Sequence, residues 1–173
     1  MRHRAAARLP DEPPPITLVQ VDSREWIAPA QEILREYGAS LAVDLCFQNF
    51  DAELDSLPGE YAPPGGQLLL AFVDGALAGC GGMRALADVD HANACEMKRL
   101  YVRPAYRRFG LGRVIAQALL DEARRAGFSV MLLDTLDEME SARELYASLG
   151  FEEIAPYYFN PIPGAHYLKA ELG

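Results

Sequence analysis

The sequence predicts a domain of the α/β (α+β) class, in which helices pack on a β-sheet. Asp74-Gly75 separates two runs rich in β-formers and favours a tight two-residue hairpin turn. Residues 112–126 repeat apolar side chains at helical spacing, which predicts an amphipathic helix. Residues 129–136 are nearly all apolar, as in a central strand covered on both faces.

The composition narrows the classes of function. The 173 residues are half hydrophobic, which is enough for one globular core. The formal net charge of −9 argues against a nucleic-acid partner, because such a partner requires a basic face. No apolar run approaches the roughly 20 residues that span a bilayer, and no signal peptide is recognisable. The three cysteines are widely spaced, so we expect a cytoplasmic protein without a metal site and without membrane attachment.

The N-terminal part of the chain divides into a tail and the start of the domain. Residues 1–15 are rich in Arg and Ala and end in three prolines, so we expect a disordered or extended tail. Residues 16–173 then form a single domain. Its first strand is predicted at residues 16–21, which are rich in β-formers.

Two helical patterns follow the first strand. The first covers about residues 26–37 and is ended by Gly38. The second covers residues 41–57, with apolar side chains broadly at helical spacing, and stops at a proline and a glycine. Residues 60–66 (EYAPPGG) break any regular structure.

The predicted hairpin consists of residues 67–73 and 76–86. Gly79, Gly81 and Gly82 lie inside its second strand, which indicates a bulge or an element packed closely against the strand.

A third strand is predicted at residues 95–102. Strict alternation sorts its side chains into two faces: Cys95, Met97, Arg99 and Tyr101 on one, and Glu96, Lys98, Leu100 and Val102 on the other.

The C-terminal half alternates between helices and strands. After the helix at residues 112–126 and the strand at residues 129–136, a shorter helix is predicted at residues 139–149. Two further strands are predicted at residues 151–154 and 165–171.

A glycine- and arginine-containing loop precedes the long helix. Arg107, Gly110 and Gly112 form an Arg-x-x-Gly-x-Gly pattern. A glycine loop at a helix start presents free backbone N–H groups and the positive end of the helix dipole, which suits a phosphate. Arg107 and Arg108 add positive charge appropriate to a pyrophosphate. The third glycine of a dinucleotide-binding loop is missing, and no Gly-Lys-Ser/Thr of a P-loop follows.

These features together resemble the GNAT acyltransferase superfamily. The matching residues are Leu100-Tyr-Val102, Arg103-Pro, the loop Arg107-x-x-Gly110-x-Gly112, and Ala142-x-x-Leu145-Tyr146-x-x-x-Gly150-Phe151. The resemblance implies a mixed, mostly antiparallel sheet of six to seven strands with helices on both faces, splayed between the fourth and fifth strands. It also implies acetyl-CoA, or another acyl-CoA, as the donor, and it allows a homodimer.

The resemblance further implies where CoA binds. The backbone of Leu100, Tyr101 and Val102 would pair with the amides of the pantetheine arm as an added strand does. The pyrophosphate would lie on the loop, whose residues are Arg107, Arg108, Phe109, Gly110, Leu111, Gly112 and Arg113. Many relatives carry an Asn seven residues before the motif tyrosine. Met139 stands there in this chain, which leaves Ser141 and the backbone to contact CoA near the thioester.

Two residues are candidates for the chemistry of acyl transfer. Tyr146 occupies the position at which relatives commonly place the acid that protonates the leaving thiolate; the alternative role is an aromatic residue of the core. Glu96 matches the catalytic glutamate of the histone-modifying branch. A carboxylate facing a partly dry pocket would have a raised pKa, which suits a base. Alternatively, Glu96 is paired with Lys98 or Arg99. A water chain then acts as the base, as it does in many relatives.

Other residues could shape the acceptor site. The loop that holds Tyr157, Tyr158 and Asn160 should approach the acceptor pocket in this fold. Asp134 lies in an apolar strand and therefore needs a partner, for which we favour a backbone group over a substrate amine. His166 is expected to have a structural role.

The function favoured by the sequence is N-acetyl transfer from acetyl-CoA to a primary amine. The acceptor is a small molecule, an amino acid or a peptide, and the amine attacks directly without a covalent enzyme intermediate. The alternative is a non-catalytic acyl-CoA-binding module that regulates a partner. The presence of both Tyr146 and Glu96 favours the enzyme.

Overall fold

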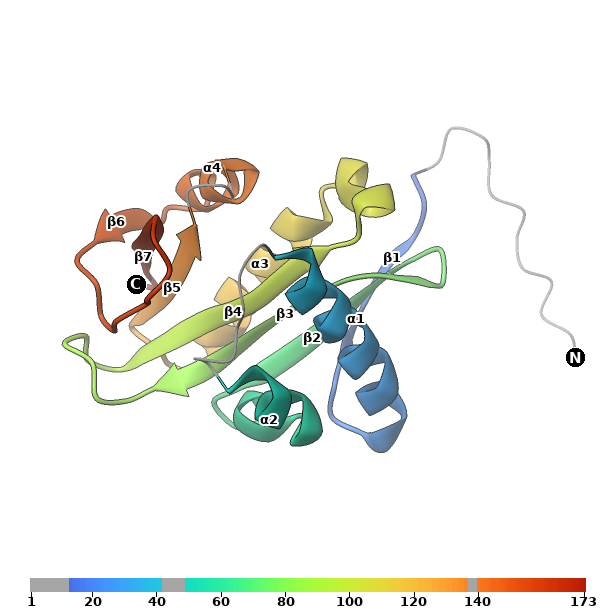
Figure 1. Ribbon diagram of the computed structural model, residues 1–173, viewed down its shortest axis with the longest axis horizontal. Coiled ribbons are helices and arrows are strands. Elements are labelled where there is room, and N and C mark those ends of the chain that lie inside the picture. The colour runs from blue at the N-terminus through green and yellow to red at the C-terminus, as the bar shows by residue number, and fades with distance from the viewer. Residues whose placement is uncertain (1–12, 42–48, 137–139) are drawn as a thin grey trace, which may run out of the picture.

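The computed structural model describes residues 13–41, 49–136 and 140–173, and for residues 140 and 141 the backbone alone. In these segments seven strands form one sheet in the order β1-β2-β3-β4-β5-β7-β6 (Figure 1). Neighbouring strands are antiparallel except for the central pair, β4 and β5. The strands are β1 (Ile16–Gln20), β2 (Gln67–Val73), β3 (Ala76–Leu86), β4 (Ala94–Val102), β5 (Val130–Leu136), β6 (Glu152–Ile154) and β7 (Ala165–Glu171).

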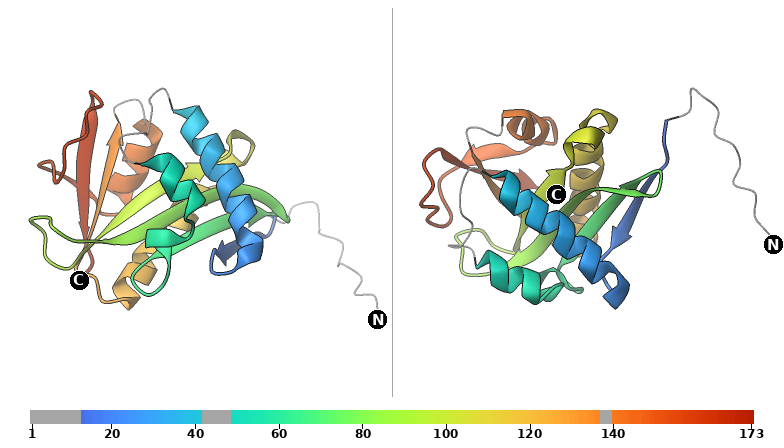
Figure 2. Two further views of the ribbon diagram at one scale, coloured as in Figure 1. Left: turned by 60° about the horizontal axis from the view of Figure 1, so that its bottom comes forward. Right: turned by 45° about the vertical axis from the view of Figure 1, so that its right-hand side comes forward.

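Helices cover both faces of this sheet. They are α1 (Ile27–Ser40), α2 (Phe50–Asp55), α3 (Leu111–Arg125) and α4 (Glu140–Ser148). Figure 2 shows α1 and α2 on one face and α3 on the other. The alternation of β2 explains the two layers: Leu68 and Leu70 are buried in the cluster with α1, whereas Leu69 and Ala71 are buried in the cluster with α3.

The sheet splays at the parallel pair, as the resemblance implies. Only three residues of each strand pair, Ala94–Glu96 with Val130–Leu132. Beyond Glu96 no pairing joins β4 to β5, although β5 continues to pair with β7 up to Leu136. The separation exposes one backbone edge of the second half of β4.

The glycines of β3 let both helical layers approach the sheet closely. A Cβ on Gly81 would lie 2.6 Å from Cγ2 of Ile115 in α3, and a Cβ on Gly82 would lie 3.0 Å from ring carbons of Tyr61 on the opposite face. Pairing with β4 also shifts between Cys80 and Gly82. Both features that the sequence indicated here, a bulge and close packing, are therefore present.

The predicted alternation of β4 is wrong beyond Lys98. Arg99 has a left-handed backbone with φ of 64°, and Arg99 and Leu100 together face the single residue Gly81 of β3. Such a β-bulge reverses which side of the sheet later residues face. The β4 side chains packed with α3 are accordingly those of Cys95, Met97, Leu100 and Val102. Arg99 and Tyr101 instead face α1 and α2, on the same side as Glu96 and Lys98.

Most of the predicted elements are present with ends shifted by one or two residues. The first helix differs most, because α1 continues through Gly38 to Ser40. Of the second helical pattern, α2 is the described helical part, and residues 42–48 lie outside the described residues. Residues 1–12 of the predicted tail also lie outside them, and residues 13–15 have no regular structure. Among the described segments, no helix is both long and apolar enough to cross a membrane.

Candidate active site

The loop before α3 leaves the start of that helix open. The chain forms a 3₁₀ turn at Pro104–Phe109, and Gly110 then takes a left-handed conformation with φ of 69°. No side chain caps α3, and the N–H of Val114 makes the bond to the Gly110 carbonyl. The backbone N–H groups of residues 111–113 therefore precede the helical ladder and suit an anion.

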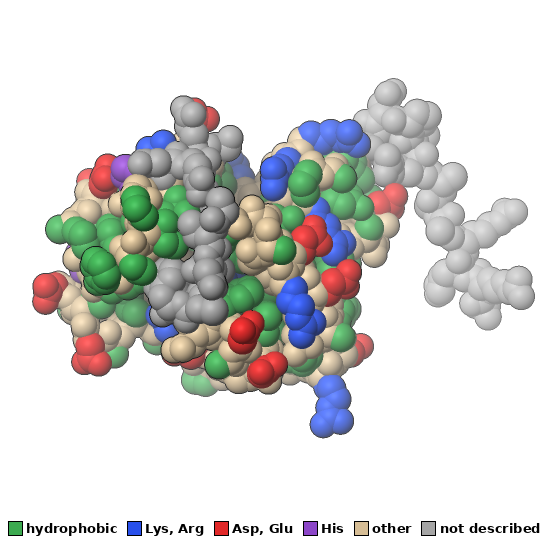
Figure 3. Space-filling model, viewed as in Figure 1, with side chains coloured by type: hydrophobic (Ala, Val, Ile, Leu, Met, Phe, Trp, Pro, Cys, Tyr) green, Lys and Arg blue, Asp and Glu red, His purple; other side chains and the backbone are tan. Residues whose placement is uncertain are grey.

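Two arginines of this loop are exposed beside the helix start. Arg107 donates from Nε to the carbonyl of Val102 at 3.0 Å, which ties the loop to the end of β4. The guanidinium of Arg108 lies over the ring of Phe109, 4.8 Å from its centroid. In Figure 3 the surface is hollowed between α4 and this turn, and Lys or Arg side chains lie on the side of the turn.

The first turn of α3 packs against α4. A Cβ on Gly112 would lie 3.3 Å from Cδ2 of Leu145, and Arg113 donates to Oγ of Ser148 at 2.7 Å. Leu111 is fully buried in the core. Gly112 therefore has a packing role beside α4, and Arg113 links the two helices.

A cavity of about 100 Å³ occupies the gap between the diverging strands. Its lining includes Met97 and Leu100 from β4, Asp134 from β5 and Tyr146 from α4. Because the β5-facing edge of residues 97–102 pairs with no described strand, its backbone groups can accept an added strand. Tyr101 contributes backbone to this edge, and its hydroxyl donates to Glu36 of α1 at 3.0 Å.

Tyr146 lies where the cavity meets the core. Its side chain is 7% exposed and contacts the edge of the Phe151 ring, with centroids 5.6 Å apart. Burial raises its pKa well above the ordinary value, so the hydroxyl keeps its proton at neutral pH. The other two residues expected near the thioester, Met139 and the side chain of Ser141, lie outside the described residues.

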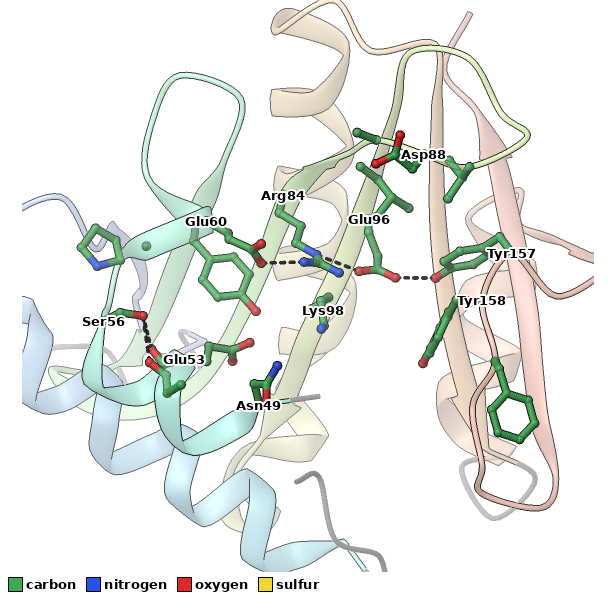
Figure 4. Close-up of a pocket in the computed structure, with 18 residues that line it drawn as sticks. Asn49, Glu53, Ser56, Glu60, Arg84, Asp88, Glu96, Lys98, Tyr157 and Tyr158 are labelled. Carbon is green, nitrogen blue, oxygen red and sulfur yellow. Dashed lines mark hydrogen bonds and ion pairs between the residues drawn. The ribbon is translucent and has the colours of Figure 1, made fainter. Parts of the chain in front are cut away.

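Glu96 lies in a second, larger pocket on the α1 and α2 face. This pocket has a volume of about 560 Å³ and lies between α2 and the loop that follows β6. Glu96 is 3% exposed; Arg84 donates from Nε to one of its oxygens at 2.9 Å, and Tyr157 donates to the other at 2.6 Å (Figure 4). The alternative that paired Glu96 with Lys98 or Arg99 is wrong about the partner, because Arg84 is the directly opposed residue on β3.

Sequence reasoning missed Arg84, and it named Lys98 and Arg99 only as possible partners of Glu96. Arg84 also binds Glu60 at 2.6 Å, and its position opposite Glu96 depends on a strand register that the sequence does not reveal. Arg99 is bonded to both carboxylate oxygens of Glu53 in α2, at 2.9 and 3.1 Å. Lys98 points into the larger pocket with Arg84 (Figure 4).

The loop after β6 approaches the pocket as expected. Tyr157 and Tyr158 line the larger pocket, and Asn160 lines the smaller cavity. Asp134 accepts hydrogen bonds from the Tyr158 hydroxyl and from Asn160 Nδ2, the latter at 2.9 Å. The expected backbone partner of Asp134 is therefore wrong, since these side chains use it to hold the loop.

Comparison with known proteins decides the family. The model of the acetyltransferase (GNAT) family matches residues 27–151. The chain belongs to the GNAT family. It is therefore an N-acyltransferase that uses an acyl-CoA donor.

Its GNAT relatives cover most of the chain. A protein of Schizosaccharomyces pombe named as an uncharacterised N-acetyltransferase is 41% identical over 143 residues, which are 82% of this chain and 83% of the relative. YjgM of Escherichia coli, also named as an uncharacterised N-acetyltransferase, is 32% identical over 124 residues, or 72% of each chain. YncA of Salmonella typhimurium, solved with acetyl-CoA, shares the fold with a TM-score of 0.71 at 24% identity, over 91% of this chain and 94% of that one.

Proposed function

We propose that the protein transfers an acetyl group from acetyl-CoA to the primary amine of a small molecule, an amino acid or a peptide. One observation carries this proposal: the gap between β4 and β5 has the open start of α3 at one end, Tyr146 in its wall and the pocket of Glu96 adjoining it. The arrangement supplies separate places for an anionic donor and for an amine.

The donor would bind along the exposed edge of β4. Its pantetheine amides pair with the backbone of Leu100–Val102, and its pyrophosphate accepts hydrogen bonds from the N–H groups of residues 111–113. Arg107 and Arg108 supply the positive charge beside the phosphates. The thioester then lies in the cavity lined by Tyr146.

The reaction is a direct displacement. The amine nitrogen attacks the thioester carbonyl carbon, the C–N bond forms and the C–S bond breaks. Glu96 takes the proton that the nitrogen gives up, and Tyr146 donates a proton to the leaving thiolate. Glu96 remains able to accept because a carboxylate has about four lone-pair sites, of which Arg84 and Tyr157 engage two.

Thermal unfolding with and without acetyl-CoA tests the donor site. At a hundred times its dissociation constant, a donor that binds only the folded state stabilises it by about 2.7 kcal/mol. Arg107→Glu should abolish most of that shift, because it places a negative charge beside the phosphates. The matched control is Arg35→Glu, which makes the same charge change at an exposed site on α1.

The outcomes are distinct. A shift that is kept by Arg35→Glu and lost by Arg107→Glu supports the donor site, and acetylation of an amine library then tests transfer. If acetyl-CoA produces no shift in the wild-type protein, the proposed donor is wrong. The cytoplasmic location and a homodimer stay predictions, which fractionation and sedimentation test.

A further inference from the structure

Lys98 lies at the junction of the two cavities. It is on β4, two residues beyond Glu96, and it lines both the larger pocket and the cavity that holds Tyr146. Figure 4 shows its side chain on the same face as Glu96 and Arg84. A group bound to Lys98 would therefore lie close to the place where the acyl group is transferred.

The ammonium of Lys98 has no hydrogen bond or ion pair with any residue that the structure describes, unlike the arginines around it. Arg84 binds two carboxylates, those of Glu60 and Glu96, and Arg99 binds the carboxylate of Glu53. The pKa of Lys98 is lowered by burial and then by the charge of Arg99. The nearby carboxylates of Glu96 and Glu53 offset this lowering only in part, so a half-buried ammonium that forms no ion pair with a described residue gains from an incoming anion.

Tyr61 places a second polar group beside Lys98. Gly82 is the cross-strand partner of Lys98, and the ring of Tyr61 lies 3.0 Å from the position that a Cβ on Gly82 would occupy. Directly opposed residues of antiparallel strands project on the same face, with Cβ atoms about 5 Å apart. The hydroxyl of Tyr61 is buried and makes no hydrogen bond of normal geometry to a described residue. Burial, and then the nearby carboxylate of Glu53, raise its pKa, so the hydroxyl keeps its proton. Tyr61 lines the same pocket.

We propose that the acceptor carries a carboxylate, bound by the ammonium of Lys98 and the hydroxyl of Tyr61, while its amine faces Glu96. The inference rests on the proposed function and narrows its acceptor to a free amino acid or a similar small amino carboxylate. Glu96 and Lys98 are two residues apart on β4, and residues so spaced on a strand are separated by about 6.5 Å. That spacing accommodates an amine and a carboxylate on the same or on adjacent carbon atoms, each within hydrogen-bond reach of its partner.

The charges of the pocket favour this orientation. The carboxylates of Glu53, Glu60 and Glu96 are each bonded to an arginine, so they compete little for Lys98. Glu96 remains the acceptor for the amine, and the donor groups of Lys98 and Tyr61 remain for the carboxylate. When buried groups of a pocket form hydrogen bonds with one group of the substrate, the pocket discriminates strongly against analogues that lack that group.

The test compares amines that differ only in the carboxylate. Free amino acids, their carboxamides and the corresponding decarboxylated amines are assayed with acetyl-CoA by release of the CoA thiol. We expect kcat/KM for the best amino acid to exceed that for its carboxamide at least tenfold. Lys98→Met, which keeps a side chain of similar length, should lower this ratio about tenfold, to near one, since the charged contact with the carboxylate is lost.

Two further variants separate recognition from structure. Tyr61→Phe should reduce the same ratio by a smaller factor, because it removes a neutral donor. Lys169→Met removes a partly exposed, paired lysine on β7 and should leave the ratio unchanged. A purely structural role of Lys98 would lower kcat/KM for the amino acid and the carboxamide equally.

The failures can be told apart. If acetyl-CoA neither binds nor reacts, the proposed function fails and the inference fails with it. If acetyl-CoA binds but the enzyme acetylates carboxamides or decarboxylated amines as well as amino acids, or no member of the panel, the inference is overturned while the donor site stands. The inference is also overturned if Lys98→Met lowers kcat/KM equally for the amino acid and for its carboxamide.

Discussion

Replacement of Tyr146 by Phe removes one hydroxyl group from the proposed reaction centre. The ring is packed against Phe151 and buried in the core, and the substitution keeps that packing. Among the described residues the Tyr146 hydroxyl makes no hydrogen bond, so its removal leaves no protein partner unsatisfied. The free energy of unfolding should therefore change by less than about 1 kcal/mol.

The effect on catalysis should be much larger than the effect on stability. A positioned general acid contributes about a hundred- to ten-thousandfold in rate, which corresponds to about 2.7–5.4 kcal/mol of activation free energy. We expect kcat to fall within that range while the dissociation constant of acetyl-CoA stays within about threefold of the wild-type value. Since burial raises the pKa of Tyr146, the wild-type acid should stay protonated, and kcat should not fall between pH 7 and 9 through loss of this proton.

The assay measures release of the CoA thiol under saturating acceptor, with acetyl-CoA affinity determined separately by calorimetry. Tyr37→Phe is the matched comparison, because Tyr37 lines the same cavity and the substitution deletes the same atom. Retention of more than about a tenth of wild-type kcat in Tyr146→Phe would refute the assignment of the acid. Equal losses in the two variants would show that the cavity as a whole, and not the Tyr146 hydroxyl, is responsible.

Two further predictions concern the thiols and the buried carboxylate. Burial raises the pKa of Cys80 and of Cys95 to about 12, so at pH 8 about one thiol in ten thousand is ionised. Peptide mass spectrometry after iodoacetamide treatment should therefore find both cysteines unmodified in the native protein and modified in denaturant. Rapid labelling of the native protein would contradict their burial. Arg84→Met removes the cation from Glu96, which is 3% exposed, and should lower the free energy of unfolding in urea by about 3 kcal/mol. Glu60→Gln, at an exposed partner of the same arginine, should cost less than about 1 kcal/mol, and equal costs for the two variants would contradict the importance of burial.

The predicted strand and helix positions depended on local physics. Hydrophobic periodicity reports which face of an element is buried, and turn residues mark where an element ends. The hairpin illustrates this, because Asp74 and Gly75 both have positive φ, as the tight turn requires. The start of the long helix was recognisable to within one residue for the same reason, because glycine is a local signal: the predicted helix begins at Gly112 and α3 begins at Leu111.

The face of each β4 residue beyond Lys98 could not be obtained in this way. Strict alternation assumes a regular strand, and no residue in the segment 95–102 (CEMKRLYV) indicates that Arg99 adopts a left-handed conformation. The bulge is defined by pairing with Gly81, and Arg99 is held on the α2 side by Glu53, 46 residues away. Arginine is not a residue that usually marks such a backbone conformation.

The sequence by itself determined the order of the elements, the glycine loop before α3 and the motif that carries Tyr146, because these depend on residues close together in the chain. Tertiary structure decided which groups surround Glu96 and Lys98. Arg84 is opposite Glu96 through strand register, Tyr157 reaches Glu96 from a loop 61 residues later, and Tyr61 lies over the glycine that faces Lys98. The charge and hydrogen bonds of the pocket therefore depend on long-range pairing and packing, which local sequence patterns do not reveal.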